Sequence, residues 1–139
     1  MTIGTRLAAS CLILALFVAP ASQADDAAGW DPTAWRDEDT IELRTTAPGG
    51  EPHWFKVWLV VLDGQLYVRL GSRAARRFEE NASRPSVAVR IAGREFPAVV
   101  GTPVPDMAER VAAAMADKYW TDVFVRYMDH PLTLRLAPG

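Results

Sequence analysis

The stretch WFKVWLVVLDGQLYVRL, residues 54–70, decides the fold. Its first half, residues 54–62, is apolar on both faces except at Lys56, which is typical of a strand that is covered on both sides. The pair Asp63-Gly64 is preferred in two-residue hairpin turns, because both turn positions need a positive φ. The segment that follows has one apolar face, formed by Leu66, Val68 and Leu70. The stretch therefore predicts an antiparallel hairpin in the middle of the structure.

Further strands and two helices are expected on both sides of this hairpin. Alternating apolar residues predict strands over residues 41–46, 86–91, 94–102 and 132–136. Ser72 is the expected N-cap of a helix that runs from Arg73 to about Asn81. Asp106 and Glu109 resemble a capping box at the start of a longer helix that ends near Lys118. Pro97 lacks the N–H that a strand ladder needs, so its strand should be an edge strand or carry a bulge there.

The order of these elements is β-β-β-α-β-β-α-β. Tight turns such as Asp63-Gly64 and Ala92-Gly93 make neighbouring strands antiparallel, and this excludes a doubly wound parallel sheet. Five or six short strands with two helices favour a closed or half-closed barrel whose helices plug its ends or seams. The fold class is therefore mainly β.

The N-terminal 24 residues have the pattern of a cleavable signal peptide. Arg6 is their only charge, an apolar run covers residues 7–19, and Ser22 and Ala24 are small residues at the cleavage positions. A second possible cleavage site lies after Ala21. The apolar run is too short to span a bilayer, so we expect export without a stable membrane anchor. Residues 25–39 form an irregular lead-in whose two tryptophans should pack onto the domain, and residues 40–139 form that domain.

Composition narrows the classes of function. The chain has a net charge of −2, and a mildly acidic domain has no electrostatic reason to bind nucleic acid. Its one cysteine lies inside the predicted signal peptide. The two histidines, His53 and His130, have no further ligand at metal-binding spacing. A metal site and a cysteine nucleophile are therefore not expected, although one histidine is enough to ligate haem iron.

Several short segments resemble the split β-barrel superfamily, which includes pyridoxamine-phosphate-oxidase-like flavoproteins and deazaflavin-dependent nitroreductase-like proteins. Residues 66–73, followed by FEEN at 78–81 and Pro85, are similar to the strand–Ser–Arg–helix–Asn–Pro segment of these proteins. Residues 42–46 resemble the first strand of the nitroreductase-like branch, and residues 117–136 resemble the tail of an uncharacterised branch. The resemblance implies a six-stranded antiparallel split β-barrel with two helices, a homodimer, and an FMN or deazaflavin cofactor.

One basic cluster is the strongest candidate for cofactor binding, and it consists of Arg69, Ser72, Arg73, Arg76 and Arg77. A helix start with a hydroxyl and nearby guanidinium groups suits an anion. The functional interpretation is that the cluster holds the phosphate of a flavin-type cofactor. The alternative is a solvated helix face, with Arg76 paired to Glu79 or Glu80.

Two further groups complete the candidate cofactor-binding residues. Arg44, Thr45 and Thr46 can offer hydrogen bonds to an isoalloxazine-like ring, or they are the polar face of an exposed strand. Trp58 and Tyr67 can stack on a planar cofactor, or they are core residues, and Lys118 can close over a pocket.

The sequence thus predicts an exported split-barrel protein that binds a flavin or deazaflavin for a reductase- or oxidase-type reaction. The lone Arg6 is not a twin-arginine signal, so the cofactor would be acquired after export. Two alternatives remain open: a non-enzymatic protein that binds haem or an apolar small molecule, and an interaction module with an empty barrel.

Overall fold

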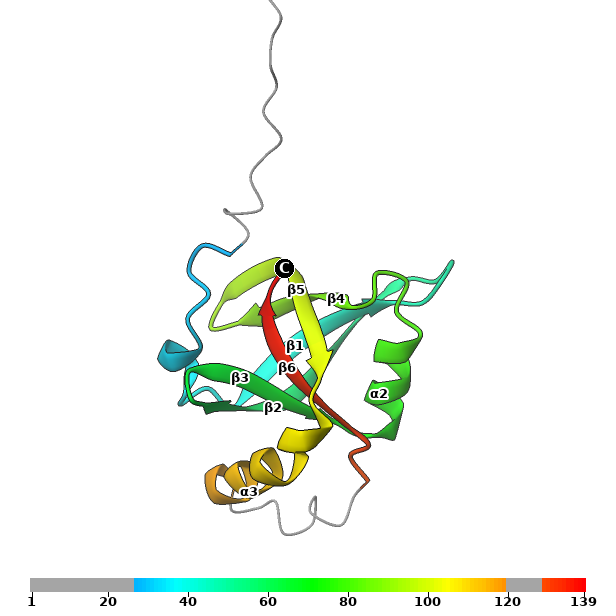
Figure 1. Cartoon of the computed structure of the whole chain (residues 1–139). Helices are drawn as coiled ribbons and strands as arrows, with labels where there is room; N and C mark the ends of the chain where they lie inside the picture. The colour runs from blue at the N-terminus through cyan, green and yellow to red at the C-terminus, as the bar shows by residue number, and fades with distance from the viewer. Residues whose placement is uncertain (1–26, 120–128) are drawn as a thin grey trace, which may run out of the picture.

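The computed structural model describes residues 27–119 and 129–139, and its centre is a closed barrel of six antiparallel strands (Figure 1). In chain order the elements are η1 (Pro32–Trp35), β1 (Thr40–Thr46), β2 (Pro52–Leu62), β3 (Gln65–Leu70), α2 (Ser72–Glu79), β4 (Ser86–Ile91), β5 (Arg94–Pro103), η2 (Pro105–Met107), α3 (Ala108–Lys118) and β6 (Leu132–Pro138). Around the barrel the strands follow β1-β2-β3-β6-β5-β4, and β4 closes onto β1. This confirms the predicted six-stranded antiparallel barrel with two helices. The predicted signal peptide lies outside the described residues.

Both tight turns have the predicted left-handed geometry. Asp63 and Gly64 have φ values of 50° and 73°, and Ala92 and Gly93 have φ values of 49° and 74°. Positive φ at both central residues gives the turn a twist that matches the right-handed twist of the flanking strands. The two turns connect β2 to β3 and β4 to β5.

Apolar side chains fill the barrel interior. The fully buried ones in this interior core come from the strands and are Ile41, Leu43, Leu59, Leu66, Leu70, Leu134, Leu136, Val68, Val89 and Val99. A small barrel has just enough interior for side chains of this size. A ligand of cofactor size therefore has to bind on the outside of the barrel.

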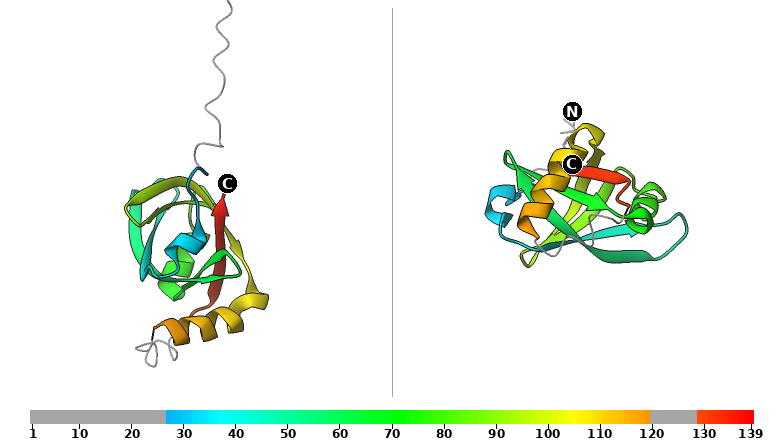
Figure 2. Two further views of the ribbon diagram at one scale, coloured as in Figure 1. Left: turned by 90° about the vertical axis from the view of Figure 1, so that its left-hand side faces the viewer. Right: turned by 90° about the horizontal axis from the view of Figure 1, so that it is seen from below.

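The two helices occupy different places (Figures 1 and 2). Helix α2 plugs one end of the barrel, where Ala75 and Phe78 join the interior core. Helix α3 instead lies against the outer face of β2 and β3, where Val111 and Met115 pack with Tyr67 in a second core. No helix in the described ranges is both long enough and apolar enough to cross a membrane.

Neither predicted helix cap is present. Helix α2 begins at Ser72 itself, with Gly71 as N-cap and no side-chain capping bond. Pro105–Met107 form a separate 3-10 turn, so α3 starts at Ala108 and Asp106 does not cap it. At the end of β5 the Val104 N–H still donates to Thr133 O. Because Val104 is held by this pairing, the residues directly after it, including Asp106, form the 3-10 turn and α3 begins only after them.

Pro97 lies at a bulge, which was one of the two arrangements predicted for it. Val87 pairs with Val99, whereas Val89 pairs with Phe96, so β5 has one extra residue between these pairs. A closed barrel has no edge strand to hold a proline. The bulge lets β5 accommodate Pro97 without losing its pairing with β4.

The lead-in packs onto the barrel, as predicted for its tryptophans. The Trp30 ring lies edge-on to Trp35 and to Phe96, at centroid distances of 5.0 and 5.1 Å. The Arg94 guanidinium donates to the carbonyl oxygens of Ala28 and Gly29, at 2.9 and 3.3 Å. This clamp fixes the chain close to the predicted cleavage site.

We expect Gly29→Ala to destabilise the protein more than Gly49→Ala. Both glycines have positive φ, so either alanine costs about 1–2 kcal/mol of backbone strain. A Cβ at Gly29 would also lie 1.9 Å from Arg94 Nη1, whereas nothing lies within 4 Å at Gly49. Displacing Arg94 should cost about a further 1 kcal/mol. Urea unfolding of both variants measures the difference in their free energies of unfolding. Equal losses of stability would contradict a stabilising role for the hydrogen bonds from Arg94 to Ala28 and Gly29.

Candidate functional site

The predicted site residues lie in three separate places on the barrel. The first is the corner between β3 and α2, with Arg69, Ser72 and Arg73. The second is the end of β1 next to α2, with Arg44, Thr45, Thr46 and Arg77. The third is the layer between β2, β3 and α3, with Trp58, Tyr67 and Lys118.

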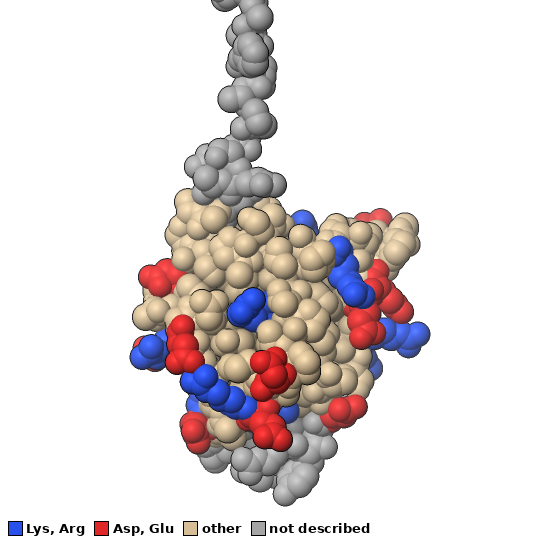
Figure 3. Space-filling view, in the orientation of Figure 1, with Lys and Arg blue, Asp and Glu red and all other residues tan. Residues whose placement is uncertain are grey.

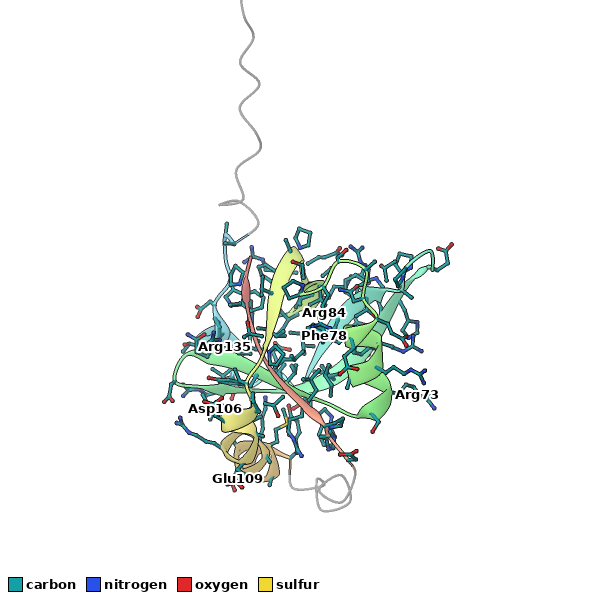
Figure 4. All side chains as sticks on the ribbon, turned by 45° about the vertical axis from the view of Figure 1, so that its right-hand side comes forward. Arg73, Phe78, Arg84, Asp106, Glu109 and Arg135 are labelled. Carbon is teal, nitrogen blue, oxygen red and sulfur yellow. The ribbon has the colours of Figure 1, made fainter. Side chains whose placement is uncertain are left out.

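The corner between β3 and α2 is exposed and positively charged. Arg73 extends from the first turn of α2 away from the barrel (Figure 4), and Arg69 is half-buried on β3. Neither arginine forms an ion pair with a described residue. The Ser72 hydroxyl donates to Asp129 Oδ2 at a long 3.5 Å. The corner therefore offers the exposed Arg73 and the half-buried Arg69, neither of which is ion-paired with a described residue, and the Asp129 carboxylate lies at Ser72.

Arg76 lies on a solvated helix face and is paired with a glutamate, which was the alternative to phosphate binding for the basic cluster. Its Nε donates to Glu80 Oε1 at 3.1 Å, one helical turn away on an exposed face. Arg77 lies on a different side of α2, faces a small pocket and forms no ion pair within the described ranges. Of the arginines on α2, Arg73 and Arg77 are thus the two that remain available to a ligand.

The pocket beside Arg77 is polar and measures about 70 Å³. Its walls are Thr45, Ala47, Glu51, His53, Arg77 and Glu80. Thr45 is only 4% exposed, and its hydroxyl forms no hydrogen bond with a described residue. A pocket of this size holds water molecules or a small ion, but it is too small for a flavin ring or a porphyrin.

Arg44 and Thr46 line a second small pocket of about 60 Å³ on the outer side of β1. The buried Asn81 lies in its wall and ties three elements together. Its Oδ1 accepts from Thr46 N at 2.9 Å, and its Nδ2 donates to Ser86 O at 2.7 Å. Asn81 therefore fixes the end of α2 to β1 and β4, which is a structural role.

The third group of residues packs under α3. Tyr67 is buried in the second core. Trp58 stacks on Tyr119, with ring centroids 4.6 Å apart and planes inclined by 10°. Lys118 Nζ donates to Leu59 O at 3.3 Å and also to Glu38 O, and burial lowers its pKa.

Lys118 also borders an open cleft of about 520 Å³ between α3 and the segment before β1. The residues that line it are Arg36, Asp37, Asp39, Val60, Val61, Ala114, Asp117 and Lys118. Its floor is apolar and its rim carries charges of both signs. The cleft is large enough for a small-molecule ligand, and Lys118 is the one predicted site residue on its wall.

Tyr119 joins the end of α3 to the barrel. Its hydroxyl oxygen lies 2.7 Å from Asp39 O and 2.8 Å from Leu59 O, and it accepts from Leu59 N at 3.3 Å. Burial raises the pKa of Tyr119 to about 12. The neutral phenol is therefore the form that the folded protein stabilises.

This shift predicts an alkaline loss of stability. The contribution of Tyr119 should be fully present below the ordinary tyrosine pKa of about 10. It should be lost as the pH rises from 10 towards 12, because only the unfolded chain ionises easily there. The free energy of unfolding, measured against pH, should fall more steeply in this range for the native chain than for Tyr119→Phe. If the free energies of unfolding of the two proteins fall equally steeply with pH in this range, the raised pKa of Tyr119 would be contradicted.

A charged cleft of about 450 Å³ on the outer barrel face was not predicted from the sequence. The residues that line it are Glu38, Thr40, Glu42, Lys56, Arg90, Ile91, Ala92, Gly93, Arg94 and Glu95. Beside it the Trp54 ring lies under two guanidinium groups, with Arg90 Cζ at 3.8 Å and Arg44 Cζ at 5.4 Å from the ring centroid. The alternation in residues 41–46 shows that Glu42 and Arg44 face outward. Only the closure of β4 onto β1 brings Arg90 to them.

Among the described residues, no group of three or more histidine, cysteine, aspartate or glutamate side chains is placed to hold a metal ion.

Comparison with known proteins identifies the fold. No protein-family model matches this chain, and no curated protein sequence matches it. Several solved structures are similar, among them the following three. HutZ, the haem storage protein from Vibrio cholerae, has 19% sequence identity and a TM-score of 0.57, over 76% of this chain and 86% of HutZ.

The second similar structure is an F420-H2-dependent reductase, with 11% identity and a TM-score of 0.53, over 71% of this chain and 94% of the reductase. The third is described as a domain-swapped dimer, with 12% identity and a TM-score of 0.54, over 72% of this chain and 80% of that chain. The closed six-stranded barrel and these similarities show that the chain has the split β-barrel fold.

Proposed function

We propose that this chain is an exported split-barrel protein that binds a flavin or deazaflavin on the outside of its barrel and uses it in a reductase- or oxidase-type reaction. The observation that supports this most is the pair of unpaired arginines, Arg69 and Arg73, at the corner between β3 and α2. The similarity to an F420-H2-dependent reductase supports the same class of cofactor.

The residues at the corner fit a phosphate in charge and in hydrogen bonding. Arg73 presents a bidentate guanidinium fork, and the first backbone N–H groups of α2 have no side-chain cap. Asp129 opposes an anion at this corner, and the bond from Ser72 to Asp129 would have to open. When bound, a flavin-type cofactor supplies hydride-transfer chemistry. The protein's part is to hold the phosphate and to orient the ring against the barrel wall.

Haem is the second candidate ligand, and two observations favour it. HutZ, described as a haem storage protein, has the same fold, and His53 lies beside Arg77 in the small polar pocket. Because this pocket is too small for a porphyrin, the ring would have to lie over its mouth, where the imidazole could ligate the iron and the arginine could pair with a propionate. The filled barrel interior argues against binding of an apolar small molecule, the alternative to haem, inside the barrel.

Titration of the purified protein distinguishes these candidates. Residues 25–139 are titrated with FMN, with deazaflavin F420 and with haemin, and the visible spectrum is recorded. Saturable binding of FMN or F420 with micromolar or tighter affinity is the expected result. Binding of haemin alone, with a Soret shift that His53→Ala abolishes, would select haem storage. A chain that binds none of the three would refute cofactor binding and leave an interaction module.

Export and a homodimer are parts of the same proposal. Within the described part of the lead-in, the first hydrogen bond to the barrel is at Ala28 O, so cleavage after Ala24 would leave every described contact intact. Mass spectrometry of the exported chain should show Asp25 as the first residue. A cellular chain that keeps residues 1–24 would contradict export. The similarity to a domain-swapped dimer supports self-association.

A further inference from the structure

Four strands place alternating charges in a single row across the outer barrel face. Lys56 on β2 is directly opposite Glu42 on β1, Glu42 is opposite Arg90 on β4, and Arg90 is opposite Glu95 on β5. All four side chains line the same 450 Å³ cleft, so they share one face. We call these four residues the charge row, and its signs read +, −, +, −.

Two of these four charges are not neutralised by a described residue. Arg90 and Glu95 form an ion pair at 2.9 Å. Lys56 and Glu42 are direct cross-strand neighbours, yet neither forms an ion pair with any described residue. Opposite charges at such positions normally stabilise a sheet by closing on each other. Here they leave one cation and one anion available to a partner.

The row has a useful symmetry. From Lys56 to Glu95 the signs are +, −, +, −, and from Glu95 to Lys56 they are −, +, −, +. A second copy that is rotated by 180° therefore places a negative charge opposite each positive charge of the first. The spacing also matches, because both rows are built on the same distance of about 4.8 Å between neighbouring strands. A row of this kind is complementary to itself in one orientation only.

The surroundings of the row have the composition of an interface. Trp54 is half-buried on the same outer face of β2 as Lys56, and its ring is stacked under Arg90 and Arg44. Tryptophan and arginine are the residues most enriched at the energetic centres of protein interfaces. By contrast, the face in front of β5 and β6 is largely uncharged (Figure 3).

We propose that the charge row is the docking surface for a second copy of this chain, arranged about a twofold axis that passes between Glu42 and Arg90. Lys56 then faces the partner's Glu95 and Glu42 faces the partner's Arg90, and each contact occurs twice. The inference rests on the proposed function only for its homodimer, and it requires no cofactor. Since the charges are partly exposed, they set orientation more than affinity, and the dimer weakens as salt rises.

Charge reversal and mixing test this interface. Sedimentation equilibrium is measured for the native chain, for Glu42→Arg and for Arg90→Glu, and circular dichroism checks that each variant is folded. Each reversal brings two like-charge pairs together, so the dimer should weaken by about a hundredfold. An equimolar mixture of the two variants should dimerise again, because the arginine of one then faces the glutamate of the other. Matched controls are Glu109→Arg on α3 and Arg135→Glu on β6, which should dimerise like the native chain.

A monomeric native chain would overturn the proposal, as would a mixture of reversed variants that stays monomeric. Loss of the dimer in Arg135→Glu alone would place the interface on the uncharged face of β5 and β6 and would also overturn it. Cofactor titration of the same samples is a separate readout, so failure of the interface and failure of cofactor binding remain distinguishable.

Discussion

Phe78→Ala is expected to lower the free energy of unfolding by about 3–5 kcal/mol. Phe78 is 2% exposed and is the large side chain with which α2 closes one end of the barrel. It packs so closely on β5 that a Cβ at Gly101 would lie 3.0 Å from its ring. Truncation leaves a cavity between a short helix and a closed sheet, and neither can move to fill it.

Urea unfolding measures this loss, and Phe55→Ala is the matched control. Phe55 is half-buried at the edge of the same core, so its truncation should cost clearly less. Because α2 carries Arg73 and Arg77, Phe78→Ala should also weaken cofactor binding at temperatures where the fold persists. Equal losses from the two variants would contradict the assignment of Phe78 as the plug.

Arg73→Ala should weaken FMN binding by about tenfold to a hundredfold and leave the stability nearly unchanged. A hydrogen bond to a charged group contributes about 1.5–3 kcal/mol, and the exposed Arg73 side chain has no ion pair with a described residue to lose. Arg76→Ala removes the same charge from the same helix, but Arg76 already pairs with Glu80. It should change the FMN affinity by much less.

Fluorescence titration of the two variants against the native chain gives the comparison. Equal effects of Arg73→Ala and Arg76→Ala would mean that only the overall charge of α2 matters. An unchanged affinity in Arg73→Ala would remove this residue from the binding site.

Local patterns in the sequence were enough to predict the barrel. The alternation in residues 66–70 and the turn at Asp63-Gly64 depend on neighbouring residues only, and the structure has both. The helix caps at Ser72 and Asp106 were predicted wrongly, because distant contacts decided them. The Ser72 hydroxyl donates to Asp129 and does not cap α2. The hydrogen bond from Val104 N to Thr133 O extends the strand pairing, so α3 starts later in the chain than predicted.

The candidate site was less predictable, because barrel closure determines which residues meet. Arg69, Ser72 and Arg73 are close in sequence and lie at one corner of the structure. Trp58 and Tyr67 face outward from adjacent strands, but α3, which is distant in sequence, covers them. Likewise the charge row exists only because β4 pairs with β1 over three residues, and no local pattern predicts that register.

The most direct test of cofactor binding at this corner compares FMN with riboflavin, which lacks the phosphate. Isothermal titration of residues 25–139 at low salt measures both affinities, and Arg73→Ala is measured in parallel. If the arginines hold the phosphate, FMN should bind at least about tenfold more tightly than riboflavin, and Arg73→Ala should remove most of that difference. Equal affinities for FMN and riboflavin, or no binding of either, would contradict the account.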